Sequence, residues 1–263
     1  MQSLRISLLF ALVAACTAAT ASITECPQHF ANGVAPEIVK TSMRPRNEEL
    51  CFESFAVMHS GLTRTPLWSA EHLTRERIDA AAALPRINSF HAEKRLRPAD
   101  RATLADYKAS GYDRGHMSPN HDMPTPHAQG ESFSLANMIP QARKINQNLW
   151  EGIESAVRDS LRPGDQLWVI TGPIFEGAEL AQLNGRVLVP TSVFKAVYDP
   201  AHDSAGAYVA SNAKDAQGMK YEVMTIAALE QRIGINLFTR MPSATKHKLM
   251  ILPKPKPHGH RKE

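Results

Sequence analysis

Short runs in which apolar and polar positions alternate mark the first third of the chain. Residues 52–59 alternate in part, and Leu67-Trp68 forms a second apolar group, a pattern that predicts a pair of strands. The following stretch, residues 71–83, is polar and charged in the way that is typical of an exposed helix. We therefore expect a strand pair that leads into a helix.

Two apolar runs in the second half predict the centre of a sheet. Residues 166–171 and 187–194 are largely apolar and bounded by Gly and Pro, as in strands that are buried on both faces. Weaker patterns predict strands at Tyr198, 207–209 and 221–223, and a short helix at 225–234. Strands and helices do not alternate regularly, so the chain favours an α+β fold over a doubly wound parallel sheet.

Two segments between these runs differ in character. Residues 85–105 are rich in charge and turn-forming residues, which predicts a long surface loop of the kind that often carries function. From Ile145 onward the apolar residues Leu149, Ile153 and Val157 recur at helical spacing and predict an amphipathic helix.

The N-terminal residues have the order of a secretory signal. Arg5 precedes an apolar run at residues 6–15, and the small residues 19–21 provide a cleavage site, so we expect cleavage after Ala21. The apolar run is too short to cross a bilayer, and no later segment offers about 20 uninterrupted apolar residues. These features predict an exported protein of the periplasm or the medium.

A lipobox-like sequence at residues 13–16 leaves a second route open, in which Cys16 is lipidated and holds the chain at a membrane. Without that lipid, no stable membrane association is expected. Cleavage after Ala21 leaves Cys26 and Cys51, an even pair that is suited to a disulfide in an oxidising compartment. Two buried free thiols are the alternative.

Length and composition bound the organisation of the mature chain. Residues 22–250 are interpreted as one domain, because a segment of this length in a chain that is 43% apolar can form a substantial core. Residues 251–263 are basic and rich in proline, which predicts a flexible, extended tail. The net charge of +4 and the pI of about 9.0 suit a polyanionic partner without identifying one.

The strongest local motif places Asp113, Arg114 and His116 within four residues. A neutral histidine is the usual group to take a proton from an attacking water near pH 7. Arginine holds phosphate oxygens in a fork of donors, and aspartate can orient a neighbouring group. This combination indicates phosphodiester hydrolysis, with His116 as general base.

A second group of polar residues follows on the predicted helix. Asn146, Trp150 and Glu154 are spaced i, i+4 and i+8 and are expected on nearly one side. An amide oxygen and a carboxylate are hard ligands that suit a largely hydrated Mg²⁺. An asparagine at a helix start is more often an N-cap, but the upstream His116 favours a metal site.

Together, these motifs resemble the DNA/RNA non-specific endonuclease family. The resemblance is carried by the tetrad 113–116, Pro140-Gln141, the series 146–154 and the run 172–175, and it extends from about residue 26 to 238. It implies a ββα-metal nuclease core within a largely antiparallel sheet flanked by helices. It also implies an endonuclease that cuts DNA and RNA with little sequence preference and leaves 5′-phosphates.

The resemblance assigns a role to each motif residue. His116 would activate the attacking water, and Asn146 would be the direct protein ligand of Mg²⁺, with Mn²⁺ as an alternative cation. Glu154 would hold metal-bound waters, Arg114 would contact phosphate and Asp113 would position the motif. The resemblance leaves a homodimer open.

The family also uses an arginine upstream of the tetrad, and Arg86 stands at about the right distance in the sequence from His116. Arg64, Arg75 and Arg77 are open alternatives for this phosphate contact.

Two other functions compete with the nuclease. His116, His121 and His127 could indicate a zinc hydrolase, but their spacing fits no helical face, no HExxH is present, and Asn146 and Glu154 would be unexplained. A catalytically silent nucleic-acid-binding homologue is the other, because folds can outlive their chemistry.

Overall fold

A computed structural model describes residues 24–214 and 220–255 of the chain. Its strands are β1 Glu37–Ile38, β2 Asn47–Cys51, β3 Phe55–Ser60, β4 Thr65–Thr74, β5 Tyr112–His116, β6 Met138–Ala142, β7 Gln166–Ile174, β8 Gln182–Leu183, β9 Val187–Leu188, β10 Ser192–Asp199, β11 Ser204–Ser211, β12 Tyr221–Met224 and β13 Ile235–Asn236. Its α-helices are α1 Arg75–Ala82, α2 Leu104–Tyr107, α3 Pro126–Ser132, α4 Glu151–Ser160, α5 Ile226–Ile233 and α6 Ser243–His247. A π-helix covers Ile145–Trp150, and 3₁₀ turns lie at Pro27–His29, Ala31–Gly33, Thr41–Met43, Asn120–Asp122 and Leu135–Asn137.

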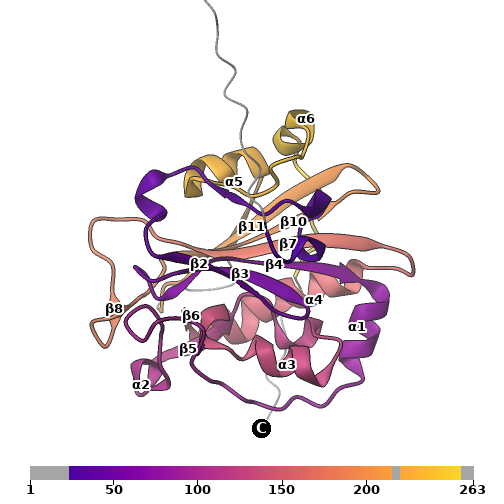
Figure 1. Ribbon diagram of the computed structural model, residues 1–263. Coiled ribbons are helices and arrows are strands. Elements are labelled where there is room, and N and C mark those ends of the chain that lie inside the picture. The colour runs from indigo at the N-terminus through magenta and orange to yellow at the C-terminus, as the bar shows by residue number, and fades with distance from the viewer. Residues whose placement is uncertain (1–23, 215–219, 256–263) are drawn as a thin grey trace, which may run out of the picture.

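An antiparallel sheet of seven strands, in the order β12-β11-β10-β7-β4-β3-β2, forms the middle layer. Helices α5 and α6 lie on one side of it, whereas α1, α3, α4 and the β5–β6 pair lie on the other (Figure 1). This arrangement is the α+β fold with a largely antiparallel sheet flanked by helices that the sequence predicts.

Both faces of the central strands are buried, because side chains alternate between two apolar layers. Along β10, Phe194 and Ala196 belong to one core cluster together with Leu229 of α5. Val193 and Val197 belong to a second cluster together with the helical residues of the opposite layer. This double burial is why β7 and β10 have nearly continuous apolar sequences.

A disulfide joins Cys26 to Cys51, with the two Cα atoms 5.8 Å apart, which confirms the expected bridge. It attaches the N-terminal segment to β2. The same segment packs against the sheet through Phe30, whose ring meets Trp68 edge-on at 5.5 Å between centroids.

The helix expected at residues 71–83 begins later, at Arg75, because β4 continues through Thr74. Glu71 and Leu73 are buried while His72 is half-buried, which is the alternation of a strand. The side chain of Thr74 then accepts a hydrogen bond from the Arg77 amide and caps the helix.

The run at residues 187–194 is also divided, since β9 ends at Leu188 and β10 begins at Ser192. Pro190 lies in the gap, and β9 pairs with β8 rather than with the central sheet. The strand expected at 166–171 is confirmed within β7, and the helix expected at 225–234 is confirmed as α5.

The expected signal at residues 1–21 lies outside the described residues, and so does most of the expected tail. The first residues of the expected tail, 251–255, form no helix or strand, but Leu252 and Pro253 contact the folded domain. Leu252 is buried in the second core cluster, and the Pro253 carbonyl accepts a hydrogen bond of 2.6 Å from the Tyr208 hydroxyl. Within residues 24–214 and 220–255, no helix has both the length and the apolar character needed to cross a membrane.

Removal of the disulfide should lower the stability of the folded chain. The bridge closes a loop with a sequence separation of 25. We expect Cys26→Ala/Cys51→Ala to reduce the free energy of unfolding by about 3 kcal/mol, because the unfolded chain regains the entropy of that loop. Urea unfolding of the variant and of the parent chain measures this loss, and equal midpoints for the two proteins would contradict it.

Candidate active site

A cleft of about 1200 Å³ is lined by residues of β5, the π-helix and α4. The residues that the sequence assigns to the site all line this cleft: Arg86, Asp113, Arg114, His116, Asn146 and Glu154. The structure therefore brings together side chains that are up to 68 positions apart in the sequence.

Strand β5 carries the tetrad 113–116 and pairs with β6, so that His116 lies opposite Met138. Gly115 is required here, because a Cβ at this position would lie 2.0 Å from Oε1 of the buried Gln141. The β5–β6 pair is followed along the chain by the π-helix and α4. This order is the ββα arrangement expected for the core of the site.

His116 sits among aromatic rings. Its ring meets Phe133 edge-on at 5.1 Å and is tilted against Phe90 at 5.8 Å. Its Nε2 is buried and has no hydrogen-bond partner among the described residues. Burial, reinforced by the charges of Arg86 and Arg114, lowers the pKa of His116 to about 3. The imidazole is therefore neutral near pH 7 and able to accept a proton.

The same rings hold two cations beside His116. The guanidinium of Arg114 lies 4.0 Å from the centroid of Phe90, and that of Arg86 lies 5.4 Å from the centroid of Phe133. Arg86 also donates from Nε to Asn88 Oδ1 at 2.9 Å. Both arginines face the cleft, where a phosphate could meet their donors.

The other three candidate arginines are engaged elsewhere. Arg64 donates to the carbonyls of Ala99 and Arg186, Arg75 pairs with Asp79 of its own helix, and Arg77 donates to the carbonyl of Ser54. None of the three lines the cleft, so among the candidates the geometry favours Arg86.

Asp113 ties the tetrad strand to the helix that follows. Its carboxylate accepts hydrogen bonds from Asn146 Nδ2 at 3.0 Å, Gln147 Nε2 at 2.9 Å and Arg143 Nε at 3.2 Å. Because Asp113 takes the amide nitrogen of Asn146, the amide oxygen is the end left to ligate a cation. Sequence reasoning missed Arg143 and Gln147 as anchors, although both flank Asn146 in the chain.

Asn146 lies inside the π-helix rather than at an N-cap, a position that Lys144 occupies without a side-chain hydrogen bond. In a regular α-helix, residues 146 and 154 would be rotated by about 80° from one another. The wider π turn changes this rotation, and both side chains face the cleft. The expectation that Trp150 shares their side is wrong, since Trp150 is 1% exposed and belongs to the core.

Glu154 contributes a carboxylate that accepts no hydrogen bond from the described residues. Burial raises its pKa to about 7, while Lys195 and Arg158 act in the opposite direction. With the amide oxygen of Asn146 it gives the cleft two hard oxygen donors and room for waters, a set that fits Mg²⁺.

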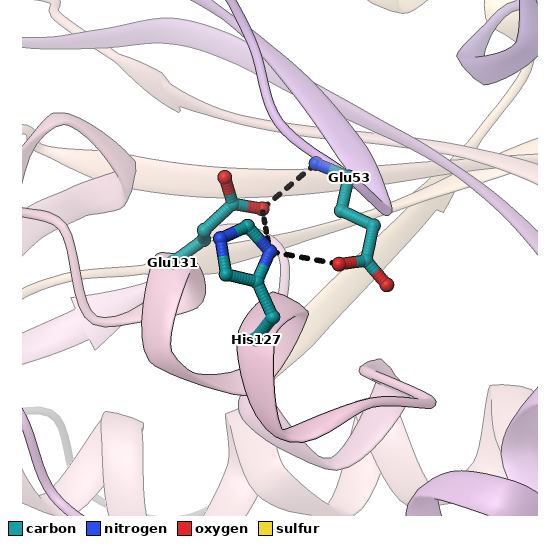
Figure 2. A group of neighbouring side chains, drawn as sticks. All are labelled: Glu53, His127 and Glu131. Carbon is teal, nitrogen blue, oxygen red and sulfur yellow. Dashed lines mark hydrogen bonds and ion pairs between the residues drawn. The ribbon is translucent and has the colours of Figure 1, made fainter.

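The three histidines of the zinc alternative do not converge. His116 and His121 line the cleft, whereas His127 lies on α3 and pairs with Glu53 and Glu131 (Figure 2). Its Nδ1 is 2.8 Å from Glu53 Oε2 and 3.9 Å from Glu131 Oε2. His127, Glu53 and Glu131 all lie outside the cleft. Their contacts tie α3 to the turn between β2 and β3.

Comparison with known proteins agrees with this geometry. The family model described as DNA/RNA non-specific endonuclease matches residues 35–244. Endonuclease G, mitochondrial, from Bos taurus is 29% identical over 238 residues, covering 83% of this chain and 78% of that protein. Nuclease C1 from Cunninghamella echinulata var. echinulata is 33% identical over 168 residues, covering 59% of this chain and 67% of the nuclease.

Among solved structures, the crystal structure of the EndoG/EndoGI complex has the same fold, with a TM-score of 0.65 at 22% identity. It covers 86% of this chain and 96% of the matched chain. Fold and site thus define a nuclease of the ββα-metal type. The chain belongs to the DNA/RNA non-specific endonuclease family.

The low pKa of His116 predicts a specific dependence of stability on pH. Between about pH 6.5 and 3 the unfolded chain binds a proton at this position and the folded chain does not, so stability falls as pH falls through that window. We expect His116→Asn to make the fall in unfolding free energy shallower by up to about 1.4 kcal/mol per pH unit. Denaturant unfolding at a series of pH values measures the two slopes.

His127 provides the control for this measurement. Its pKa is raised by the hydrogen bond to Glu53, so its contribution is present at low pH and is lost as pH rises. His127→Asn should therefore act above about pH 6.5, where it removes a loss of stability with rising pH, and not in the window of His116. Identical slopes for the His116 variant and the parent chain would contradict a buried neutral imidazole.

Proposed function

We propose that this protein is an exported, Mg²⁺-dependent endonuclease that hydrolyses DNA and RNA with little sequence preference and leaves 5′-phosphates. The observation that carries the proposal is the single cleft in which a neutral His116 faces two cations and two oxygen donors. Mn²⁺ is the alternative cation.

In the proposed mechanism, His116 takes the proton from the water that attacks phosphorus. Arg114 and Arg86 hold the phosphate oxygens and stabilise the charge that grows on them. Asp113 keeps the amide of Asn146 turned so that its oxygen and the Glu154 carboxylate can hold the cation and its waters. When bound there, the cation supplies Lewis-acid stabilisation of the phosphate and of the leaving 3′ oxygen.

Recognition through phosphate explains the expected breadth of substrate. The charged groups of the cleft suit the backbone that DNA and RNA share, so cutting should tolerate sequence and weaken as salt increases. Both named relatives are nucleases, which supports a nucleic-acid substrate for this chain.

Export rests on separate observations. The signal-like order of residues 5–21 supports it, and the Cys26–Cys51 disulfide suits an oxidising compartment. Lipidation at Cys16 is the variant of this proposal in which the enzyme stays at a membrane. The family resemblance leaves a homodimer open, and the oligomeric state can be measured directly.

The activity has a direct test. Purified mature protein should cut both plasmid DNA and RNA with Mg²⁺ and should lose this activity with EDTA. His116→Ala should slow cutting by at least about 100-fold, because the water loses its base. Gel analysis gives the rates, and ligation of the products reports their 5′-phosphates.

His127→Ala is the matched control, since this histidine lies outside the cleft and should leave the rate unchanged. If a correctly folded parent chain cuts neither DNA nor RNA with Mg²⁺ or Mn²⁺, the proposed enzyme activity is wrong. The chain would then be interpreted as a catalytically silent nucleic-acid-binding homologue.

The arginine assignment gives a second prediction. Arg86→Ala should lower kcat on a short duplex by about 100-fold, the usual effect of removing one donor to a developing charge. Arg75→Ala is the control, because Arg75 pairs with Asp79 outside the cleft and should leave kcat unchanged. If Arg75→Ala lowered kcat more than Arg86→Ala, the assignment of the phosphate contact to Arg86 would be wrong.

A further inference from the structure

Lys195 interrupts an apolar face of the central sheet. It lies on the same face of β10 as Val193 and Val197, which are buried toward the layer that contains the cleft. Lys195 itself is 1% exposed and does not line the cleft. A lysine this deep is costly unless its ammonium has partners, so its contacts indicate what it does.

Three groups surround the Lys195 ammonium. Nζ donates a hydrogen bond of 2.8 Å to Thr171 Oγ1, and it lies 4.0 Å from Oε1 of Glu71. It also lies 5.9 Å from the ring centroid of Trp150, within the range of a cation–π contact. Glu71 is 1% exposed, and neither of its carboxylate oxygens has a hydrogen-bond partner among the described residues.

Lys195 is one end of a polar row that crosses the sheet. Ser69 lies opposite Thr171, and Thr171 lies opposite Lys195, so the three residues occupy adjacent strands at one level. Two strand spacings place the ends of this row roughly 10 Å apart. At the Ser69 end, its hydroxyl lies 2.7 Å from that of Ser118, two residues after His116.

The other end of the row meets the helix that carries the cation donors. Trp150 is the last residue of the π-helix, and Asn146 lies four residues before it. A π-helix is rare and needs tertiary contacts to hold its wider turn. The contact between the Lys195 ammonium and the Trp150 ring is such a contact, and it comes from a strand that is paired on both sides.

We propose that Lys195 is a positioning residue for the cation site: its ammonium, held by Thr171, fixes the ring of Trp150 and thereby the π-helix that presents Asn146. The inference rests on the proposed function, since it concerns the cation site of that cleft. The polar row then holds the segment that carries His116 and the π-helix that carries Asn146 at a fixed separation across the sheet.

The test compares three variants of the full mature chain. Lys195→Met removes the ammonium but keeps a long side chain. Glu71→Gln/Lys195→Met removes both ionisable groups of the buried pair, which is better tolerated than leaving one of them alone. Phe194→Leu is the control, because Phe194 is the adjacent buried residue of β10 and faces the opposite core cluster.

Two readouts are needed, neither of which is catalytic activity. Isothermal titration of MgCl₂ into protein without nucleic acid gives the dissociation constant, and thermal unfolding without metal gives Tm. Lys195→Met should lower Tm and raise the Mg²⁺ dissociation constant at least about tenfold, as loss of outer support at a metal site does. The double variant should recover Tm but keep the weakened affinity, and Phe194→Leu should lower Tm with unchanged affinity.

Recovery of both Tm and Mg²⁺ affinity in the double variant would overturn the inference, because Lys195 would then serve only to neutralise Glu71. An unchanged dissociation constant for folded Lys195→Met would overturn it as well. A parent chain that neither binds Mg²⁺ nor cuts nucleic acid contradicts the proposed function itself. If the parent chain binds Mg²⁺ and cuts nucleic acid, but Lys195→Met has the same Mg²⁺ dissociation constant as the parent, only this inference is contradicted.

Discussion

The carboxylate of Asp113 joins the strand that carries His116 to the helix that carries Asn146. Strand β5 is fixed by its pairing with β6, and the π-helix and α4 are fixed by the core cluster beneath them. Between these two bodies, three hydrogen bonds to one carboxylate set the orientation of the Asn146 amide. The relative placement of His116, the proposed base, and of Asn146, a proposed cation donor, therefore depends on the Asp113 side chain.

Electrostatics in the cleft follows from the aromatic rings as much as from the charges. Phe90 and Phe133 pack against the ring of His116 and also hold Arg114 and Arg86 beside it. The two cations that disfavour a proton on His116 are the same groups that are available to a phosphate. A bound phosphate would offset their charge and make it easier for the imidazole to take a proton as the water attacks.

The sequence predicted those parts of the molecule that depend on local pattern. The apolar run of β7 is a local feature, and it forms the buried strand that was expected. The tetrad 113–116 is also local, and its residues follow one another on β5. The end of β4 was misplaced, because Glu71 looks like a residue of an exposed helix until its burial in the folded chain is known. An ionisable residue such as Glu71 is rarely buried in a strand, so its position there can be understood only from its tertiary contacts.

The π-helix and the choice among the arginines were beyond sequence reasoning for a related reason. Nothing in residues 145–150 distinguishes a π turn from an α turn, since the difference depends on packing against the sheet. Likewise, Arg86 and Arg75 differ only in what surrounds them, which is Phe133 in one case and Asp79 in the other. The family resemblance identified the chemistry, and tertiary contacts identified which residues can supply it.

The order of the strands has a consequence for the synthesis of such an enzyme. The cleft residues lie between positions 86 and 154, but the strands that support them, β7 and β10, come later in the chain. A nascent chain that ends before Lys195 has every group that lines the cleft, but it lacks most of β10 and all of β11 and β12, which complete the central sheet. Because domains fold as their last supporting elements emerge, nuclease competence is delayed until most of the chain has been made. This delay separates synthesis of the chain from the appearance of an activity directed at nucleic acids.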